Sequence, residues 1–407
     1  MKRQSLVFSL AFPMALFALS GCSDDASGDA ALDGQGGACT VEDQGDGTAI
    51  LRCPDGSEFT VSNGMSGADG KDGKDGNDGN DGKDAQEPPC ALTENDDGTH
   101  TLTCGNQSVV IGAPCEAGFP GDVIVTDESD VEAASHLMLF QVSSCTWIRG
   151  QVMISKYPGE ELPKALERIE KVDGNVIVTQ NEELVEVGFP VLKTVDGIFA
   201  FMGNPKLVAT SLPALESVGE SLMWAANEEL ASVGELPKLT EVGGDLGWGS
   251  NPNLEHTPDV PELASVGGYL GWDLNESLVS IGAFPKLTTV GGTLEWRRSK
   301  SLENMGSFDA LESVGDLSIR DTASLEAIVE FPKLETVAKD LTIRQNAALT
   351  DIGGLGSLTM VGGDFTVQDN PELSTCDVED PISLIQDADG IGGTTTTTGN
   401  DNSCIVL

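Results

Sequence analysis

A pattern of 23 or 24 residues repeats through much of this 407-residue chain, and its fullest copies read VGGDLGWGSNPNL and VGGYLGWDLNESL. A period of this length indicates a solenoid, because one unit cannot bury its apolar residues alone and must stack on its neighbours. The aliphatic residue before the glycines serves as the anchor of each rung. The anchors are Ile148, Val172, Val195, Val218, Val242, Val266, Val290, Val314, Val337 and Val361.

The residues after each anchor predict one strand and one corner. Apolar residues four and six places after the anchor alternate with small or polar ones, as in a half-buried strand. Asparagine recurs nine places after the anchor, where its side chain suits a repeated tight corner, and serine or threonine replaces it twice. We predict a mainly β fold: a right-handed parallel β-helix, or leucine-rich-repeat-like solenoid, of about ten to eleven rungs, preceded by small disulfide-stapled hairpins.

Tryptophan occupies the six-place offset in four successive rungs, at Trp224, Trp248, Trp272 and Trp296. Aliphatic or phenylalanine residues hold this offset in the other rungs, so we expect the tryptophans to form a ladder in the core. The alternative is an exposed aromatic track for carbohydrate. The intervening glycines favour that alternative, because they would leave the outward side shallow and open: Gly247, Gly249 and Gly271.

Three arginines fall seven places after successive anchors, once a one-residue deletion in the rung of Val314 is counted: Arg297, Arg320 and Arg344. Odd offsets face outward if the leucines and tryptophans face inward. The arginines would then form a stripe that binds an anion such as a sugar acid, a phosphate group or a partner's carboxylates. The alternative is that nearby carboxylates neutralise them as exposed ion pairs: Glu295, Asp321 and Asp340.

A threonine run at residues 394–398 lies between Ile391 and Asn400. With Ile391 as an anchor, Asn400 falls nine places later, as the asparagine column requires. We therefore interpret the run as a polar terminal rung that blocks end-to-end stacking, and a flexible threonine-rich tail is the alternative. Cys376 and Cys404 bracket this segment, and a disulfide between them would hold the cap in place.

These features resemble the receptor L domain family, the leucine-rich β-helical module of the insulin and epidermal growth factor receptor ectodomains. The resemblance covers roughly residues 115–404. It is carried by the opening Cys145-Thr-Trp-Ile-Arg-Gly-Gln-Val-Met-Ile, by the repeated Leu-x-x-Val-Gly-Gly rungs and by the Asn-Pro-x-Leu-x-x-Cys of residues 370–376. It implies a disulfide between Cys115 and Cys145 across a short helix at residues 127–142. It also implies a binding function, without naming a ligand.

The amino terminus resembles a bacterial lipoprotein signal. A basic start precedes an apolar run at residues 5–18 that is too short to span a bilayer, and Leu19-Ser20-Gly21-Cys22 closes it. Cleavage before Cys22 would leave that cysteine lipidated, with a membrane as partner through the anchor. Ser23 rather than aspartate follows, which by resemblance to sorted lipoproteins indicates the outer membrane. An ordinary secretory peptide is the alternative.

Nine cysteines less Cys22 leave eight, and an even number in an exported protein favours disulfides. Four of them bound two similar segments, CTVEDQGDGTAILRC and CALTENDDGTHTLTC, each with an Asp-Gly turn between alternating apolar residues. Hairpins this small need stapling, so we predict disulfides Cys39–Cys53 and Cys90–Cys104. A zinc site is disfavoured because there is no CxxC pair and the three histidines lie apart.

Seven Gly-x-y triplets at residues 64–84 separate the hairpins. Glycine at every third place is the collagen requirement, but the run has no proline. It is either a trimeric rod, which would make the chain a homotrimer, or an extended solvated spacer. The predicted parts are a signal peptide (1–21), anchor and first hairpin (22–63), spacer (64–84), second hairpin (85–114) and a solenoid with capped ends (115–407).

A formal net charge of −44 argues against nucleic acid or anionic lipid as partner of the protein's body. There is no P-loop or HExxH motif, and no histidine within a repeat element has an evident serine or cysteine partner. We therefore predict no enzyme activity, no cofactor and no metal. The predicted function is that of an outer-membrane surface lipoprotein whose solenoid binds an extracellular protein or glycan. The alternative is a structural envelope protein without a dedicated ligand.

Overall fold

The computed structural model describes residues 118–126, 145–387 and 390–401, and the strands between residues 40 and 111. The chain divides into two units between Gly82 and Lys83. The predicted signal peptide (1–21), the Gly-x-y segment (64–84) and the predicted helix (127–142) lie outside the described residues. These three assignments therefore stay predictions.

Each predicted hairpin belongs to a three-stranded antiparallel sheet. The first sheet contains β1 (Thr40–Asp43), β2 (Thr48–Arg52) and β3 (Glu58–Ser62), and the second contains β4 (Ala91–Glu94), β5 (His100–Cys104) and β6 (Gln107–Ile111). The pairs β1–β2 and β4–β5 are the predicted hairpins, whereas β3 and β6 were not predicted. The disulfides predicted to close the two hairpins stay predictions.

Two parallel ladders of short strands run along the solenoid, and each regular rung contributes one strand to each ladder. The first ladder lies at the anchors and contains β8 (Trp147–Ile148), β10 (Lys171–Val172), β13 (Thr194–Val195), β16 (Ser217–Val218), β18 (Glu241–Val242), β20 (Ser265–Val266), β24 (Thr336–Val337) and β26 (Met360–Val361). The second ladder contains β7 (Val123–Val125), β9 (Val152–Ser155), β11 (Val176–Thr179), β14 (Phe199–Met202), β17 (Leu222–Ala225), β19 (Leu246–Gly249), β21 (Leu270–Asp273), β25 (Leu341–Arg344), β27 (Phe365–Gln368) and β28 (Thr395–Thr396).

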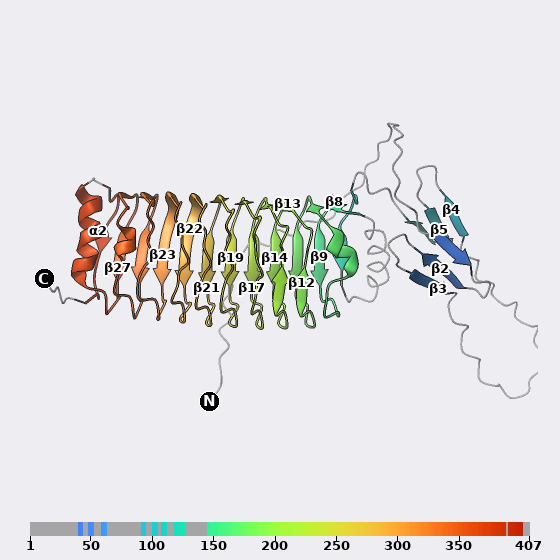
Figure 1. The fold of residues 1–407 in the computed structure, drawn as a ribbon, viewed down its shortest axis with the longest axis horizontal. Coiled ribbons are helices and arrows are strands. Elements are labelled where there is room, and N and C mark those ends of the chain that lie inside the picture. The colour runs from blue at the N-terminus through green and yellow to red at the C-terminus, as the bar shows by residue number, and fades with distance from the viewer. Residues whose placement is uncertain are drawn as a thin grey trace, which may run out of the picture. The chain divides into compact units, whose positions relative to one another are not determined.

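Two strands, β22 (Thr289–Arg297) and β23 (Ser313–Arg320), extend through both ladders. Their register shifts between Val290 and Thr293, where the one-residue deletion in the rung of Val314 is absorbed. A third side of the coil has sparser pairing, between β12 (Glu186–Gly188) and β15 (Ala209–Ser211) and at isolated bridges. Figure 1 shows the rungs side by side from green to red, and the predicted parallel β-solenoid is confirmed.

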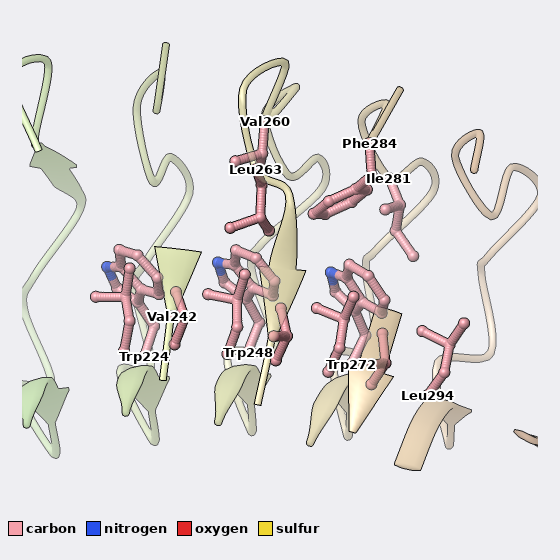
Figure 2. Close-up of a cluster of buried hydrophobic side chains, with 14 of the residues drawn as sticks. Trp224, Val242, Trp248, Val260, Leu263, Trp272, Ile281, Phe284 and Leu294 are labelled. Carbon is pink, nitrogen blue, oxygen red and sulfur yellow. The ribbon is translucent and has the colours of Figure 1, made fainter. Parts of the chain in front are cut away.

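The tryptophans lie in the core, as predicted. Each of the four is at most 1% exposed, and the rings of successive tryptophans stack with centroids 5.3–5.7 Å apart and planes within 15°. Figure 2 shows Trp224, Trp248 and Trp272 in equivalent orientations on neighbouring rungs, with Phe284 packed beside the last. The core ladder is therefore confirmed, and the alternative of an exposed aromatic track is wrong.

One residue of each rung from Ile148 to Ile391 adopts the left-handed conformation, with φ between 50° and 79°, eight places after the anchor when the deletion is counted. This column contains Lys156, Gln180, Gly203, Ala226, Ser250, Leu274, Arg298, Asp321, Gln345, Asp369 and Gly399. Only two of them are glycines. Each of the others raises the energy of the folded chain by about 1–2 kcal/mol, so the corner needs a compensating interaction.

The asparagine that follows the left-handed residue supplies that interaction. Asn251 Nδ2 donates to the Trp224 carbonyl at 3.0 Å, and Asn251 Oδ1 accepts from the Asn227 backbone N–H at 3.2 Å. Similar hydrogen bonds link Asn181, Asn204, Asn227, Asn251 and Asn275 in one run and Asn346, Asn370 and Asn400 in another. Ser299 and Thr322 replace asparagine between the two runs, and Thr322 still joins the second run because its backbone N–H and hydroxyl donate to Asn346 Oδ1 at 3.1 and 2.8 Å.

An additional rung precedes the first predicted one. Phe119 forms a parallel bridge with Ile148, and β7 pairs with β9. Asp122 Oδ1 accepts the Gln151 backbone N–H at 3.0 Å, so a side chain as well as the strand joins the two rungs. The solenoid therefore begins one rung earlier than the periodic pattern alone predicted.

The carboxyl-terminal end carries the predicted polar rung and a helix that was not predicted. β28 pairs with β27, and Asn400 Oδ1 accepts the Asn370 backbone N–H at 3.1 Å, which confirms the threonine rung over the flexible tail. Helix α2 (Thr375–Asp387) caps this end (Figure 1) and buries Val378, Ile382 and Ile385. Shorter 3-10 helices are η2 (Lys164–Arg168) and η3 (Gly353–Leu355). Among the described residues, no helix is long and apolar enough to cross a bilayer.

We expect Asn251→Ala to lower the free energy of unfolding by about 1–3 kcal/mol, because the buried groups that it bonds lose their partner. Urea unfolding of the full chain measures this change. Ser299→Ala is the matched control from the same column, since the Ser299 hydroxyl makes only a 3.3 Å contact with the Arg297 carbonyl, and it should lower stability less. Equal losses for the two variants would contradict the role assigned to the asparagines.

Candidate functional site

The outward side chains of the second ladder form one continuous surface, which we call the outer face. They come from the second and fourth residues of each four-residue strand, because alternate side chains point to opposite sides of a sheet. The first column contains Met153, Ile177, Ala200, Met223, Gly247, Gly271, Glu295, Ser318, Thr342 and Thr366. The second column contains Ser155, Thr179, Met202, Ala225, Gly249, Asp273, Arg297, Arg320, Arg344 and Gln368.

The predicted arginine stripe lies on the outer face. The strand register places Arg297 opposite Arg320 and Arg320 opposite Arg344, so the predicted alignment on successive rungs is confirmed. The spacing of neighbouring strands separates their Cα atoms by ~4.8 Å. All three side chains are half-buried, and the Nε atoms of Arg320 and Arg344 are buried without a hydrogen-bond partner.

The middle arginine is neutralised by a buried carboxylate. Glu295, 7% exposed, accepts from Arg320 Nη2 at 2.5 Å and from the Ser318 hydroxyl at 3.0 Å. On the neighbouring rungs, Asp273 pairs with the guanidinium of Arg298, and this hydrogen bonding raises the pKa of Arg298. The carboxylates at the centre of the outer face, Asp273 and Glu295, are therefore each paired with an arginine.

The two outer members of the stripe differ from the middle one. Among the ion pairs of the described residues, none includes Arg297 or Arg344, and none uses Asp321 or Asp340. Asp340 Oδ1 instead accepts the backbone N–H of Asp364 at 2.8 Å. Within the described part of the chain, the alternative of neutralisation therefore holds for Arg320, through Glu295, and leaves the guanidinium groups of Arg297 and Arg344 able to pair with an anion.

Tyr269 covers the glycines of the outer face. A Cβ atom built on Gly271 would lie 2.2 Å from the Tyr269 hydroxyl, and one built on Gly247 would lie 3.6 Å from the tyrosine ring. The hydroxyl donates to Glu295 Oε2 at 3.3 Å. The expectation of a shallow, open surface at Gly247 and Gly271 is therefore wrong, because the tyrosine fills it and both glycines are buried. Tyr269 was not among the predicted site residues. Its position two places before Gly271, beside an outward column that contains two successive glycines, could have indicated that its ring covers them.

We expect Tyr269 to remain protonated well above pH 10 in the folded protein. Burial, together with the charges of Glu295 and Asp273, raises its pKa above the ordinary value. The unfolded chain would release this proton near pH 10, so the stabilisation is complete below that pH and is lost as the pH rises beyond it. The loss amounts to about 1.4 kcal/mol for each further pH unit until the folded-state pKa is reached.

The chain has two tyrosines, so Tyr157→Phe isolates the absorbance of Tyr269. This variant should develop phenolate absorbance only when it unfolds. Phenolate absorbance that appears near pH 10 while the circular dichroism spectrum is still native would contradict the assignment.

Behind the outer face, the indole N–H groups are unevenly satisfied. Trp224 Nε1 donates to the Thr210 hydroxyl at 3.0 Å, and that hydroxyl donates to the Val233 carbonyl at 2.9 Å. The indole nitrogens of the other three tryptophans, and the hydroxyl of Thr257 at the position equivalent to Thr210, are buried without a partner. Packing of the rings, rather than hydrogen bonding, therefore holds most of the tryptophan column.

The third side of the coil contains a serine–histidine contact that was not predicted. His256 Nδ1 lies 2.7 Å from the Ser280 hydroxyl of the next rung, so the statement that no repeat-element histidine has such a partner is wrong. A cavity of about 300 Å³ beside His256 is lined by Ser232, Glu235 and Asp259 among others. Among the described residues, no carboxylate hydrogen-bonds to His256, so the pair lacks the group that orients the base in a catalytic triad. The absence of catalysis stays a prediction.

Two of the predicted cysteines can be placed. Cys145, buried at the start of the solenoid, and Cys376, at the start of α2, are each disulfide-bonded. Their predicted partners, Cys115 and Cys404, lie outside the described residues, so the pairings stay predictions. The lipidation residue Cys22 and the hairpin cysteines Cys39, Cys53 and Cys90 also lie outside them, and of Cys104 only the backbone in β5 is described.

The described residues contain no group of three or more histidine, cysteine, aspartate or glutamate side chains that could hold a metal ion. Comparison with protein-family models, with curated proteins and with solved structures found no match for this chain. The arrangement that bears on function is thus the outer face, with a neutralised centre and two guanidinium groups that no described carboxylate pairs.

Proposed function

We propose that the protein is a non-catalytic binding protein of the bacterial cell surface, held by a lipid anchor, and that the outer face of its solenoid is the binding site. The observation that carries the proposal is the strand register that aligns Arg297, Arg320 and Arg344 on one face. Two of these arginines have no ion pair among the described residues of a chain with a formal net charge of −44. Such a site suits an anionic group on an extracellular protein or glycan.

Charge distribution favours binding over the alternative of a structural envelope protein without a ligand. A purely structural solenoid gives no reason for one face to differ in charge from the rest. The outer face instead carries only two acidic residues from β9 to β25, Asp273 and Glu295, and each is paired with an arginine. Such a strip is expected of a surface that meets a partner.

The proposed family and position in the cell rest on sequence. The resemblance to receptor L domains supports a ligand-binding module, and the parallel solenoid is compatible with it. Residues 1–22 support a lipoprotein exported to the outer membrane. The Gly-x-y segment would separate the solenoid from the anchor, either as one extended spacer or as a collagen-like rod in a homotrimer.

Replacing Cys22 with alanine should move the protein from the membrane fraction to the soluble fraction and abolish acyl labelling, because the acyl chains supply the attachment. Fractionation and metabolic labelling of the producing cells measure both effects. Ser23→Ala is the adjacent control and should leave both unchanged. A Cys22→Ala protein that stays in the membrane fraction would rule out the lipid anchor.

Binding through the stripe should be lost in the double variant Arg297→Gln/Arg344→Gln. Two charge-assisted contacts disappear, so the affinity for a carboxylate polymer such as polyglutamate should fall about tenfold or more. Binding to the wild-type chain should also weaken as salt is added. Surface plasmon resonance with the full mature chain measures both effects.

Arg320 is left intact in this test, because Arg320→Gln would remove the ion-pair partner of the buried Glu295 and destabilise the fold. The control Lys206→Gln/Lys286→Gln removes two exposed, ion-paired lysines elsewhere and should bind like the wild type. Equal affinities for the two double variants would show that the arginines form no site.

A further inference from the structure

The half of the outer face that precedes the arginines has an unusual composition for this chain. From β9 to β19, none of its residues is aspartate, glutamate, lysine or arginine. The whole sequence, in contrast, contains 66 acidic and 22 basic residues. A solvated face with no binding role would be expected to carry some of these charges, so their absence needs an explanation.

The uncharged half presents apolar side chains to solvent. Met202 is 42% exposed, and Met153, Ile177 and Met223 are half-buried. Strand pairing sets Met153 beside Ile177, and the small residue Ala200 lies between Ile177 and Met223 in the same column. Ala200 itself is buried, so the accessible apolar side chains of this half are Met153, Ile177, Met202 and Met223, one from each of four consecutive rungs, which we call the methionine strip.

The methionine strip and the arginine stripe belong to one surface. The same two columns run from Met153 and Ser155 through the glycines covered by Tyr269 to the arginines. Methionine, tyrosine and arginine are the residues enriched where proteins meet, whereas lysine, glutamate and aspartate are depleted there. The composition of the outer face follows that pattern over ~40 Å, given the ~4.8 Å spacing of its rungs.

We propose that the outer face docks a protein partner whose contact surface is apolar at one end and carries carboxylates at the other. The apolar end lies on the methionine strip, where the flexible thioethers adapt to the partner's side chains. The carboxylates pair with Arg297 and Arg344. The inference rests on the proposed function, since it names the partner of the same face.

Other occupants fit the outer face less well. A charged glycan would find the arginines but no use for the methionines, and the one aromatic ring on the face, Tyr269, is already packed over glycines. An acyl chain needs an enclosing cavity, and the cavity beside His256 lies on the third side of the coil, away from the outer face.

A second copy of the chain would also leave the arginines without carboxylates. Two outer faces related by a twofold axis place arginine opposite arginine when the solenoids run parallel, and arginine opposite methionine when they run antiparallel. Neither arrangement satisfies the charge at the arginine end.

The test compares two peptides of equal length, one of glutamate alone and one with leucines followed by glutamates, on the full mature chain. The leucine–glutamate peptide should bind more tightly than polyglutamate. Met202→Gln/Met223→Gln should weaken it about fivefold or more and leave polyglutamate binding unchanged. Met360→Gln is the matched control, because Met360 is 44% exposed but lies on the first ladder, and it should have no effect. Unchanged urea midpoints establish that the variants are folded.

The outcomes separate this inference from the proposed function. If both peptides bind equally and the methionine variant has no effect, the partner's apolar contact is ruled out while anion binding stands. If neither peptide binds the wild type, the proposed function fails with it. Three other results would assign a different occupant and overturn the proposal. A leucine–lysine peptide could bind as tightly as the leucine–glutamate peptide, or anionic vesicles could bind only when the methionines are present. The chain could also form a dimer that Met202→Gln dissociates.

Discussion

The rest of the solenoid depends on a corner that is unfavourable by itself. Each rung turns through a residue in the left-handed conformation, and in most rungs that residue is not glycine. The asparagine that follows offsets this with side-chain hydrogen bonds to the rungs on either side, as Asn251 does to Trp224 and Asn227 before it and to Asn275 after it, so a single isolated rung would lack the compensation. The corner is therefore stable only in a stack, which makes stability a property of neighbouring rungs rather than of each rung alone.

Along the stack, the interior side chains stay nearly the same from rung to rung, whereas the side chains of the outer face change from apolar to charged. Inside, one aromatic or aliphatic residue repeats at each level, and the stacked tryptophans require their neighbours to keep the same register. Outside, the same register leaves two columns free to vary from methionine through glycine to arginine. In the two rungs where the outer face becomes charged, Ser299 and Thr322 replace the asparagines of the column. The same two rungs supply Glu295 and Arg320, which form an ion pair on the outer face.

Residues that repeat with the period could be assigned from sequence, because a regular coil places equal offsets in equal environments. The anchors, the buried tryptophans, the asparagine column, the deletion near Val314 and the threonine rung belong to this class. Elements that break the period could not be assigned: Phe119 lies 29 residues before Ile148, and α2 is marked only by the helical spacing of Val378, Ile382 and Ile385. The covering of Gly271 by Tyr269, the Glu295–Arg320 pair and the His256–Ser280 contact depend on side-chain rotamers across two rungs. A one-dimensional period predicts alignment, but not which neighbour a side chain bonds.

The two runs of the asparagine ladder have a mechanical consequence. Tension between any tether on the amino-terminal side and a partner held at Arg297 and Arg344 passes through the rungs up to β25. Those rungs contain the unbroken run from Asn181 to Asn275 and the stacked indole rings. They also contain Ser299, whose hydroxyl contacts only the Arg297 carbonyl of its own rung, whereas Thr322 on the next rung donates to Asn346 and joins the second run. A pulled molecule should thus yield first at the rung of Ser299 and last in the rungs from Asn181 to Asn275.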